Sequence, residues 1–158
     1  MASPILAVDD LTINFHLKRG TLTAVDGVTF AIGRGETFGL VGESGSGKTV
    51  TARAIMRLIP TPPGEIASGT IAFEGADVLE LSDNEIRALR GKRIAMVFQE
   101  PMSALNPVFT VGTQIMDVLR TNLGLTRSEA RERTIELLGL VGIPSPASRL
   151  GSYVHEFS

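Results

Sequence analysis

The chain has 158 residues, of which 43% are hydrophobic, and this is enough for one core of ordinary size with at most a small satellite domain. Its 15 basic residues are outnumbered by 17 acidic ones, and the net charge of −2 disfavours a surface that coats nucleic acid, so no nucleic-acid partner is expected. The absence of cysteine excludes disulfides, thiolate metal sites and a cysteine nucleophile.

Neither a signal peptide nor a membrane-spanning helix is expected from the sequence. The start of the chain lacks a basic region, and Asp9 and Asp10 stand where a signal peptide requires apolar residues. The longest uncharged stretch, residues 101–116, contains two prolines, Asn106 and Gly112, so it is too broken to cross a bilayer as a helix. Any association with a membrane is therefore expected to go through a partner.

The first third of the chain is predicted to be rich in β-structure. Alternating apolar residues over 6–17 predict a half-buried strand, and a glycine-containing turn leads from it to a second strand around 25–32. These two strands are expected to form an antiparallel hairpin. The apolar segment 36–41 then predicts a buried strand.

A glycine-rich segment, GESGSGKT at Gly42–Thr49, follows this predicted strand and precedes a helix predicted over 50–59. It fits the pattern GxxxxGK[ST], in which the glycines let the backbone N–H groups converge on phosphate oxygens. Lys48 supplies a positive charge for the β- and γ-phosphates, and Thr49 supplies a hydroxyl for Mg²⁺. The positive end of the helix dipole adds to the attraction. The segment therefore predicts a nucleoside triphosphate site.

The middle of the chain combines strands with a short helix. Prolines and a glycine end the preceding helix, and residues 69–75 predict a strand that rejoins the hairpin. Ser82 and Glu85 form a capping box for a helix to about Arg90. The continuous apolar run 94–98 predicts a strand buried on both faces.

The last third is predicted to be helical. Thr110 can cap a helix to about Leu123, and Thr126 with Glu129 forms a second capping box for a helix through Leu140. The apolar residues of this second helix are expected near one face: Ala130, Ile135, Leu138 and Val141. The whole pattern predicts a nucleotide-binding core with a helical lobe attached.

Three segments carry a more specific signal together: AVDGVTF at 24–30, GESGSGKT at 42–49 and FQEPMSALNP at 98–107. They resemble the ATP-binding subunits of ABC transporters, in the branch of dipeptide, oligopeptide and nickel importers, and the third resembles the Q-loop of that branch. The resemblance covers essentially the whole chain. It implies an α/β fold, with a P-loop NTPase core of the ABC type, an antiparallel β subdomain and a helical subdomain. Residues 1–99 would form the core with the β subdomain, and residues 100–158 the Q-loop and helical subdomain.

The same resemblance implies ATP and Mg²⁺ as cofactors. Lys48 and Gln99 are then expected to be catalytic, and Thr49 and Gln99 to contact the metal, because an amide oxygen at a strand end can touch Mg²⁺ or the attacking water. The aromatic ring of Phe15 would stack on adenine. The full set of expected nucleotide contacts is Phe15, Gly42, Glu43, Ser44, Gly45, Ser46, Gly47, Lys48, Thr49 and Val50.

Each of these assignments has a plainer alternative. Phe15 can be a core residue of its strand, and Gln99 can be a polar strand terminus. The loop can be a glycine-rich turn without a ligand. Glu43 matches the importer branch but is expected to be a solvated side chain rather than a base.

The segment YVHEFS at the end of the chain resembles the run in which the family's signature motif begins, with Val154 in place of the usual proline. The signature glycines, the acidic strand, the catalytic glutamate and the switch histidine of the family lie beyond Ser158. We therefore expect a fold that is incomplete at the C-terminus. The 158-residue chain is expected to bind nucleotide, with ATPase activity only in the complete protein.

The leading functional hypothesis is an ABC importer subunit that couples ATP binding and hydrolysis to uptake of peptides or a related solute, with nickel also possible. The implied partners are integral membrane permease subunits, a second ATP-binding subunit in a homo- or heterodimer and, indirectly, a solute-binding protein. The implied location is peripheral, at the cytoplasmic face of the plasma membrane. Two alternatives stay open: a nucleotide-binding fragment without turnover, and a soluble P-loop ATPase not linked to transport.

Overall fold

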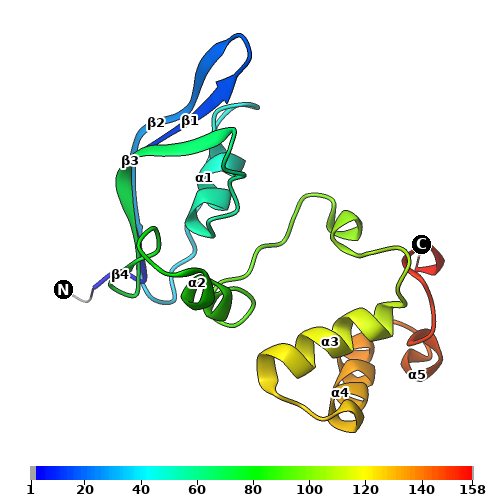
Figure 1. Cartoon of the computed structure of the whole chain (residues 1–158). Coiled ribbons are helices and arrows are strands. Elements are labelled where there is room, and N and C mark those ends of the chain that lie inside the picture. The colour runs from blue at the N-terminus through cyan, green and yellow to red at the C-terminus, as the bar shows by residue number, and fades with distance from the viewer. Residues whose placement is uncertain (1–2, 158) are drawn as a thin grey trace. The chain divides into compact units, whose positions relative to one another are not determined.

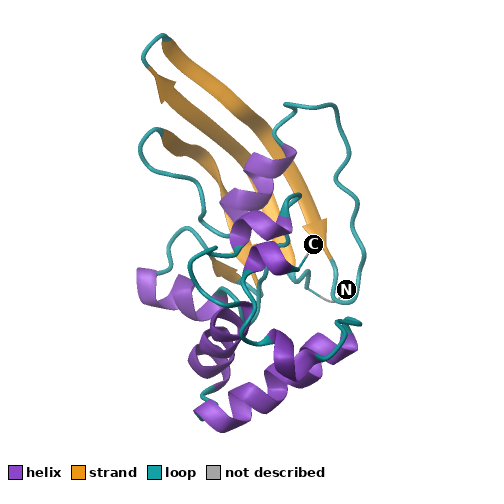
Figure 2. Cartoon of the chain, turned by 90° about the vertical axis from the view of Figure 1, so that its right-hand side faces the viewer, coloured by secondary structure: helices purple, strands orange, loops and turns teal. Residues whose placement is uncertain are grey.

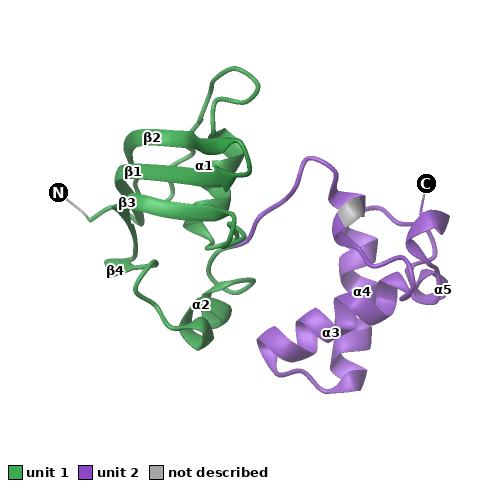
Figure 3. Ribbon diagram, turned by 45° about the horizontal axis from the view of Figure 1, so that its top comes forward, with its two compact units in different colours: residues 1–94 green, residues 95–158 purple. Residues whose placement is uncertain are grey.

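The computed structural model describes residues 3–157, apart from the side chain of Ser103. It divides into two compact units, Met1–Ile94 and Ala95–Ser158 (Figure 3). The first unit is mixed α/β with an antiparallel sheet, and the second is helical (Figure 1). The domain boundary predicted between residues 99 and 100 lies a few residues further along the chain and stays a prediction.

The first unit is built on a four-stranded antiparallel sheet with the order β2-β1-β3-β4. Its strands are β1 (Leu6–Leu17), β2 (Gly20–Ile32), β3 (Gly64–Phe73) and β4 (Ala76–Asp77). The predicted hairpin is confirmed, because Leu6 pairs with Ile32 and Leu17 pairs with Gly20. The strand predicted over 69–75 is part of the longer β3, which rejoins the hairpin beside β1 as expected.

A bulge in β1 places the core residues on one face of the sheet. Side chains of a regular strand alternate between faces, so Val8 and Leu11, three positions apart, would point to opposite sides. The register of β1 against β2 shifts between these two residues, and Asp10 has a φ of 46° there. The extra residue turns Leu11 back to the face that carries Val8, and both side chains are buried.

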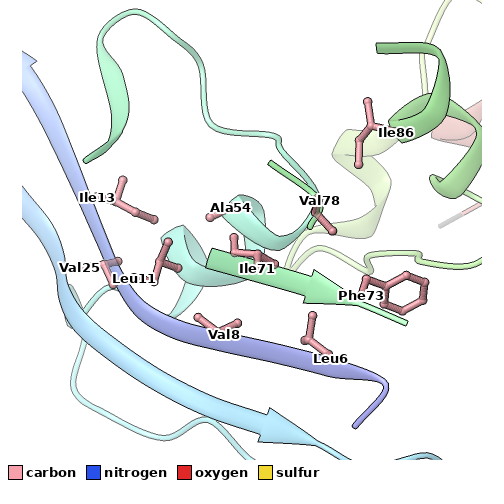
Figure 4. Close-up of a cluster of buried hydrophobic side chains, with 10 residues drawn as sticks. All are labelled: Leu6, Val8, Leu11, Ile13, Val25, Ala54, Ile71, Phe73, Val78 and Ile86. Carbon is pink, nitrogen blue, oxygen red and sulfur yellow. The ribbon is translucent and has the colours of Figure 1, made fainter. Parts of the chain in front are cut away.

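The core of the first unit packs between the sheet and helix α1 (Lys48–Ile55), which lies along one face of the sheet (Figure 2). Ten buried residues form it: Leu6, Val8, Leu11, Ile13, Val25, Ala54, Ile71, Phe73, Val78 and Ile86 (Figure 4). Ala54 of α1 is fully buried among them, because its small side chain lets the helix approach the strands closely.

Helix α1 is shorter at its C-terminal end than the helix predicted over 50–59. Arg57 adopts the left-handed conformation with a φ of 49°, and the N–H of Leu58 donates to the carbonyl of Arg53 at 2.8 Å. This is a Schellman arrangement, which ends an α-helix by reversing the chain direction. Glycine is the usual residue at such a position. Because an arginine stands there instead, the sequence does not indicate that the helix ends at this point.

Helices α2 (Asp83–Leu89), α3 (Val111–Leu123) and α4 (Arg127–Leu140) begin at the predicted caps. The short helix α5 (Pro146–Arg149) and the 3-10 helices η1 (Pro101–Ala104) and η2 (Val154–Glu156) were not predicted. Thr110 accepts a hydrogen bond from the N–H of Thr113 at 3.3 Å. Both predicted capping boxes, Ser82 with Glu85 and Thr126 with Glu129, are confirmed.

Two predicted strands are wrong in this structure. Residues 36–41 and 94–98 form no strand, and within residues 3–157 the sheet ends at β2 and β4, neither of which pairs with them. A strand requires hydrogen bonds to a neighbouring strand, so an apolar run without such a neighbour does not form one. The side chains of Val41 and Val97 are accordingly 90% and 87% exposed.

The predicted apolar face of α4 is correct in part. Ala130 and Leu138 are buried and Ile135 is half-buried, but Val141 is 73% exposed. Val141 is the C-cap residue that follows α4, so its side chain does not continue the buried stripe. Among the described residues, 3 to 157, no helix is long and apolar enough to cross a membrane.

Candidate functional site: a phosphate-binding loop at the start of helix α1

The loop turns into α1 at Gly47, which is the N-cap residue of the helix. Gly45 and Gly47 have φ values of 84° and 88°, in the left-handed region where glycine is favoured. A Cβ atom on Gly47 would also lie 2.5 Å from the carbonyl oxygen of Ala24 in β2. Only glycine therefore fits between the strand and the start of the helix.

The first turn of α1 leaves backbone donors available to a ligand. The N–H of Thr51 is bonded to the carbonyl of Gly47 at 2.8 Å, whereas the preceding N–H groups of a helix have no partner within it. This first turn contains no acidic residue. Free N–H groups and the positive end of the helix dipole together favour an anion such as phosphate.

The Lys48 ammonium lies over the carbonyl groups of the loop. Its Nζ atom donates to the carbonyl oxygens of Gly42 at 2.8 Å and Glu43 at 2.6 Å, and it lies 3.3 Å from Oγ of Ser46. These acceptors are neutral, so an anionic phosphate oxygen would form a stronger hydrogen bond with the same ammonium group. The loop carbonyls thus hold the Lys48 ammonium group at the loop, and the group can exchange these carbonyls for phosphate oxygens.

A small cavity of about 140 Å³ lies at this loop. It is lined by Ala24, Gly45, Ser46, Gly47, Lys48, Thr49 and Val50. All but one of these residues were expected as nucleotide contacts from the sequence. Ala24 was missed, although it stands in the AVDGVTF segment, because its place beside the loop follows from strand packing and not from spacing in the sequence.

The other loop residues contribute differently. Gly42 and Glu43 take part through their backbone carbonyls, and the side chain of Glu43 is exposed, as the solvated alternative predicts. Ser44 is exposed at the outer part of the loop, and Thr49 is exposed at the second position of α1. The predicted roles of Ser44 in nucleotide binding and of Thr49 in metal binding stay predictions.

Phe15 lies in β1 and packs against the core of the first unit. In the register of the sheet it lies opposite Gly64 of β3 and Leu22 of β2. Its ring edge is close enough to β3 that a Cβ on Gly64 would lie 3.2 Å from the ring. The ring is only half-buried, so one part of it remains accessible. These contacts favour the packing alternative, and adenine stacking stays a prediction.

Gln99 is exposed and follows the segment 94–98, which forms no strand. It belongs to the second unit, whereas Lys48 and Thr49 belong to the first. Its predicted contact with Mg²⁺ and with the attacking water therefore stays a prediction. Within the described part of the chain, no group of three or more histidine or acidic residues could hold a metal ion.

A model of the ABC transporter family matches residues 25–158. Because this match spans most of the sequence, the chain belongs to the ABC transporter family. The fold agrees with this assignment. The dimeric structure of a bacterial ABC transporter cassette matches 97% of this chain with a TM-score of 0.81 at 21% identity, and this chain covers 63% of it. The structure of that cassette bound to ADP and Pi, in a post-hydrolysis state, matches equally well.

Curated relatives are considerably more similar in sequence. The oligopeptide transport ATP-binding protein OppD of Bacillus subtilis is 49% identical over 154 residues, which cover 98% of this chain and 43% of the relative. The dipeptide transport ATP-binding protein DppD of the same organism is 45% identical over 154 residues, which cover 98% of this chain and 46% of the relative. The peptidoglycan transport ATP-binding protein YejF of Agrobacterium fabrum is 49% identical over 155 residues, which cover 98% of this chain and 28% of the relative. The chain thus spans less than half the length of these relatives.

Proposed function

We propose that the full-length protein is an ATP-binding subunit of an ABC importer, which couples ATP binding and hydrolysis to solute uptake. The observation that carries this proposal is the loop at the start of α1. There, Lys48, the left-handed Gly45 and Gly47 and the unpaired amides of the first helical turn converge on one small cavity. This combination of donors suits the β- and γ-phosphates of ATP.

The proposed chemistry places a different task on each predicted residue. Lys48 would bind the phosphates and offset their charge, and the Thr49 hydroxyl would bind Mg²⁺. Gln99 would contact the metal and orient the attacking water, since its neutral amide oxygen can accept a hydrogen bond from water. Phosphoryl transfer depends chiefly on such positioning and charge stabilisation.

The proposed solute is a peptide. This rests on relatives named for oligopeptide, dipeptide and peptidoglycan transport. The proposed partners are integral membrane permease subunits, a second ATP-binding subunit and, indirectly, a solute-binding protein. The proposed location is the cytoplasmic face of the plasma membrane, where the subunit is held by the permease. Nickel uptake is the alternative that a transport experiment must separate from peptide uptake.

The test is uptake by proteoliposomes that contain the full-length protein with its permease subunits, supplied with a solute-binding protein and MgATP. We expect uptake of a radiolabelled tripeptide, and no uptake of nickel-63. Lys48→Ala should abolish uptake, whereas Lys92→Ala, which removes an exposed lysine far along the chain from the loop, should leave it unchanged. Uptake of nickel without peptide would overturn the solute, and uptake that survives Lys48→Ala would overturn the coupling.

A Gln99→Ala variant tests the second catalytic residue. We expect ATP affinity without Mg²⁺ to stay near that of the wild type, because the Gln99 amide is proposed to act on the metal and the water. The rate of Mg²⁺-dependent phosphate release should fall at least tenfold, about the loss of one well-placed hydrogen bond to a charged group. An unchanged rate would remove Gln99 from the site.

For the 158-residue chain by itself, we propose nucleotide binding without turnover. It spans 43% of the length of OppD, and its apolar residues Val41 and Val97 are exposed, in segments that form no strand. Phosphate release by the chain should equal that of buffer. Phosphate release that depends on Mg²⁺ and vanishes in Lys48→Ala would contradict this proposal. It would require a catalytic base within the 158 residues.

A further inference from the structure

The C-terminal end of α1, opposite the phosphate-binding loop, is held by the side chain of Arg90. Its Nε atom donates to the carbonyl oxygen of Met56 at 2.8 Å, and its Nη2 atom donates to the carbonyl oxygen of Arg57 at 2.7 Å. One guanidinium group thus binds two successive carbonyls, with its planar set of donors spread over both.

These two carbonyls lie just beyond the last turn of α1. The N–H groups of Arg57 and Leu58 donate to the carbonyls of Ala54 and Arg53, each at 2.8 Å, and so satisfy two carbonyls near the end of α1. The carbonyls of Met56 and Arg57 follow this turn. A cation at a helix C-terminus also interacts favourably with the negative end of the helix dipole. Arg90 is therefore matched to its site both in hydrogen bonding and in charge.

A second arginine ties the same two segments in the opposite direction. The side chain of Arg57, at the end of α1, donates to the carbonyl of Leu81 and lies 3.5 Å from the Asp83 carboxylate at the start of α2. The N–H of Arg90 ends α2 by donating to the carbonyl of Ile86 at 3.1 Å, and Ile86 is buried in the same core as α1. The end of α1 and helix α2 are thus joined by side chains from both sides.

We propose that Arg90 is a positioning residue for the nucleotide site, acting through α1. This inference rests on the proposed function, in which the loop at the start of α1 binds ATP. The helix has eight residues and a length of about 12 Å, and it is rigid enough to carry a displacement from one end to the other. Hydrogen bonds to phosphate change strength over a few tenths of an ångström. Arg90 fixes the far end of α1 and thereby the place of Lys48 and the first-turn amides.

Arg90 also lies in the turn that leads towards the predicted Q-loop. The N–H of Gly91 donates to the carbonyl of Ile94 at 2.8 Å, and the N–H of Ile94 lies 3.2 Å from the carbonyl of Leu89. This turn precedes the segment that carries Gln99 in the sequence. The side chain of Arg90 therefore fixes the helix that carries Lys48, and the backbone of Arg90 leads into the turn from which the chain continues to Gln99.

The experiment compares Arg90→Ala and Arg90→Lys in the full-length protein, with Arg87→Ala as the matched control. Arg87 is an exposed arginine in the last turn of α2. The Kd for MgATP is measured by titration calorimetry, well below the thermal unfolding midpoint of each variant. The ³¹P NMR signal of the bound β-phosphate is recorded as well, because it reports on phosphate contacts and not on overall stability.

Arg90→Ala should raise the Kd roughly tenfold, and Arg90→Lys, which keeps the charge but not the planar fork of donors, roughly threefold. Both variants should shift the β-phosphate signal, and Arg87→Ala should match the wild type. If Arg90→Ala does not fold, the Kd and the ³¹P signal of Arg90→Lys test the inference. Variants that are less stable but keep the wild-type Kd and ³¹P signal would show a purely structural arginine and overturn the inference. A wild-type protein that binds no ATP would instead overturn the proposed function, and this inference with it.

Discussion

Gly47 and Ala24 approach so closely that a Cβ atom on Gly47 would lie 2.5 Å from the carbonyl oxygen of Ala24. Gly45, in the same loop, has no such neighbour, because a Cβ atom there would meet no atom within 4 Å. The strand β2 therefore sets the position at which the loop turns into α1. The fit between strand and loop is a feature of the fold that the spacing of the glycines alone does not show.

Gly47→Ala should consequently cost more than Gly45→Ala. Both residues have left-handed φ values, 88° and 84°, so both substitutions carry backbone strain of about 1–3 kcal/mol. Only Gly47→Ala adds a collision with Ala24, which displaces the loop from the strand. We expect it to lower the free energy of unfolding further, and to weaken ATP binding more, as measured by urea denaturation and calorimetry. Equal losses of stability and ATP affinity in the two variants would show that the contact with Ala24 contributes nothing to either.

Phe15→Leu separates the two roles of Phe15. Leucine keeps an apolar side chain against the core, so the free energy of unfolding should change by less than about 1.5 kcal/mol. It removes the aromatic face, and if that face stacks on adenine, the affinity for ATP should fall while the affinity for inorganic triphosphate stays unchanged. Calorimetric titrations with both ligands measure this difference. A variant that binds ATP as the wild type does would make Phe15 a core residue only.

The two capping boxes predict a pH dependence of stability. The hydroxyl of Ser82 and then its backbone N–H hold the pKa of Glu85 below its ordinary value, and Thr126 lowers the pKa of Glu129 in the same way. A carboxylate whose folded-state pKa is lowered stabilises the protein above its unfolded-state pKa, about 4.3 for glutamate. That contribution is lost as the pH falls through the lower folded-state pKa.

Thermal unfolding midpoints measured between pH 7 and pH 3 test this effect. The wild-type midpoint should fall below about pH 4.3. A double variant with Glu85→Gln and Glu129→Gln keeps hydrogen-bonding side chains that do not titrate, so its midpoint should fall less steeply in acid. Parallel curves for the two proteins would show that these glutamates do not govern acid stability.

The parts of the fold that the sequence predicted well are those that depend on neighbouring residues. Each capping box needs only a hydroxyl and a glutamate three positions apart, and both boxes formed as predicted. The hairpin of β1 and β2 also follows from alternation and a glycine turn. The loop predicted from GESGSGKT forms at the start of a helix with left-handed Gly45 and Gly47, whereas Gly42 does not have a positive φ.

The errors arise where distant residues decide the structure. Segments 36–41 and 94–98 have the composition of buried strands, but a strand exists only beside a partner, and the apolar pattern does not say where the partner is. The stop of α1 depends on Arg57 in a conformation that usually selects glycine. The site residue Ala24 and the positioning residue Arg90 were likewise invisible, because their roles come from contacts made across the fold.

The affinity of this chain for ATP, with and without Lys48, tests the central claim most directly. Isothermal titration of ATP into the wild type, Lys48→Ala and the control Lys92→Ala, all shown to be folded, measures the contribution of the Lys48 ammonium at the loop. A charge-assisted hydrogen bond contributes about 1.5–3 kcal/mol, so Lys48→Ala should bind ATP at least tenfold more weakly while Lys92→Ala binds as the wild type does. Equal ATP affinity in all three proteins would contradict the assignment of the Gly42–Thr49 loop as the phosphate site.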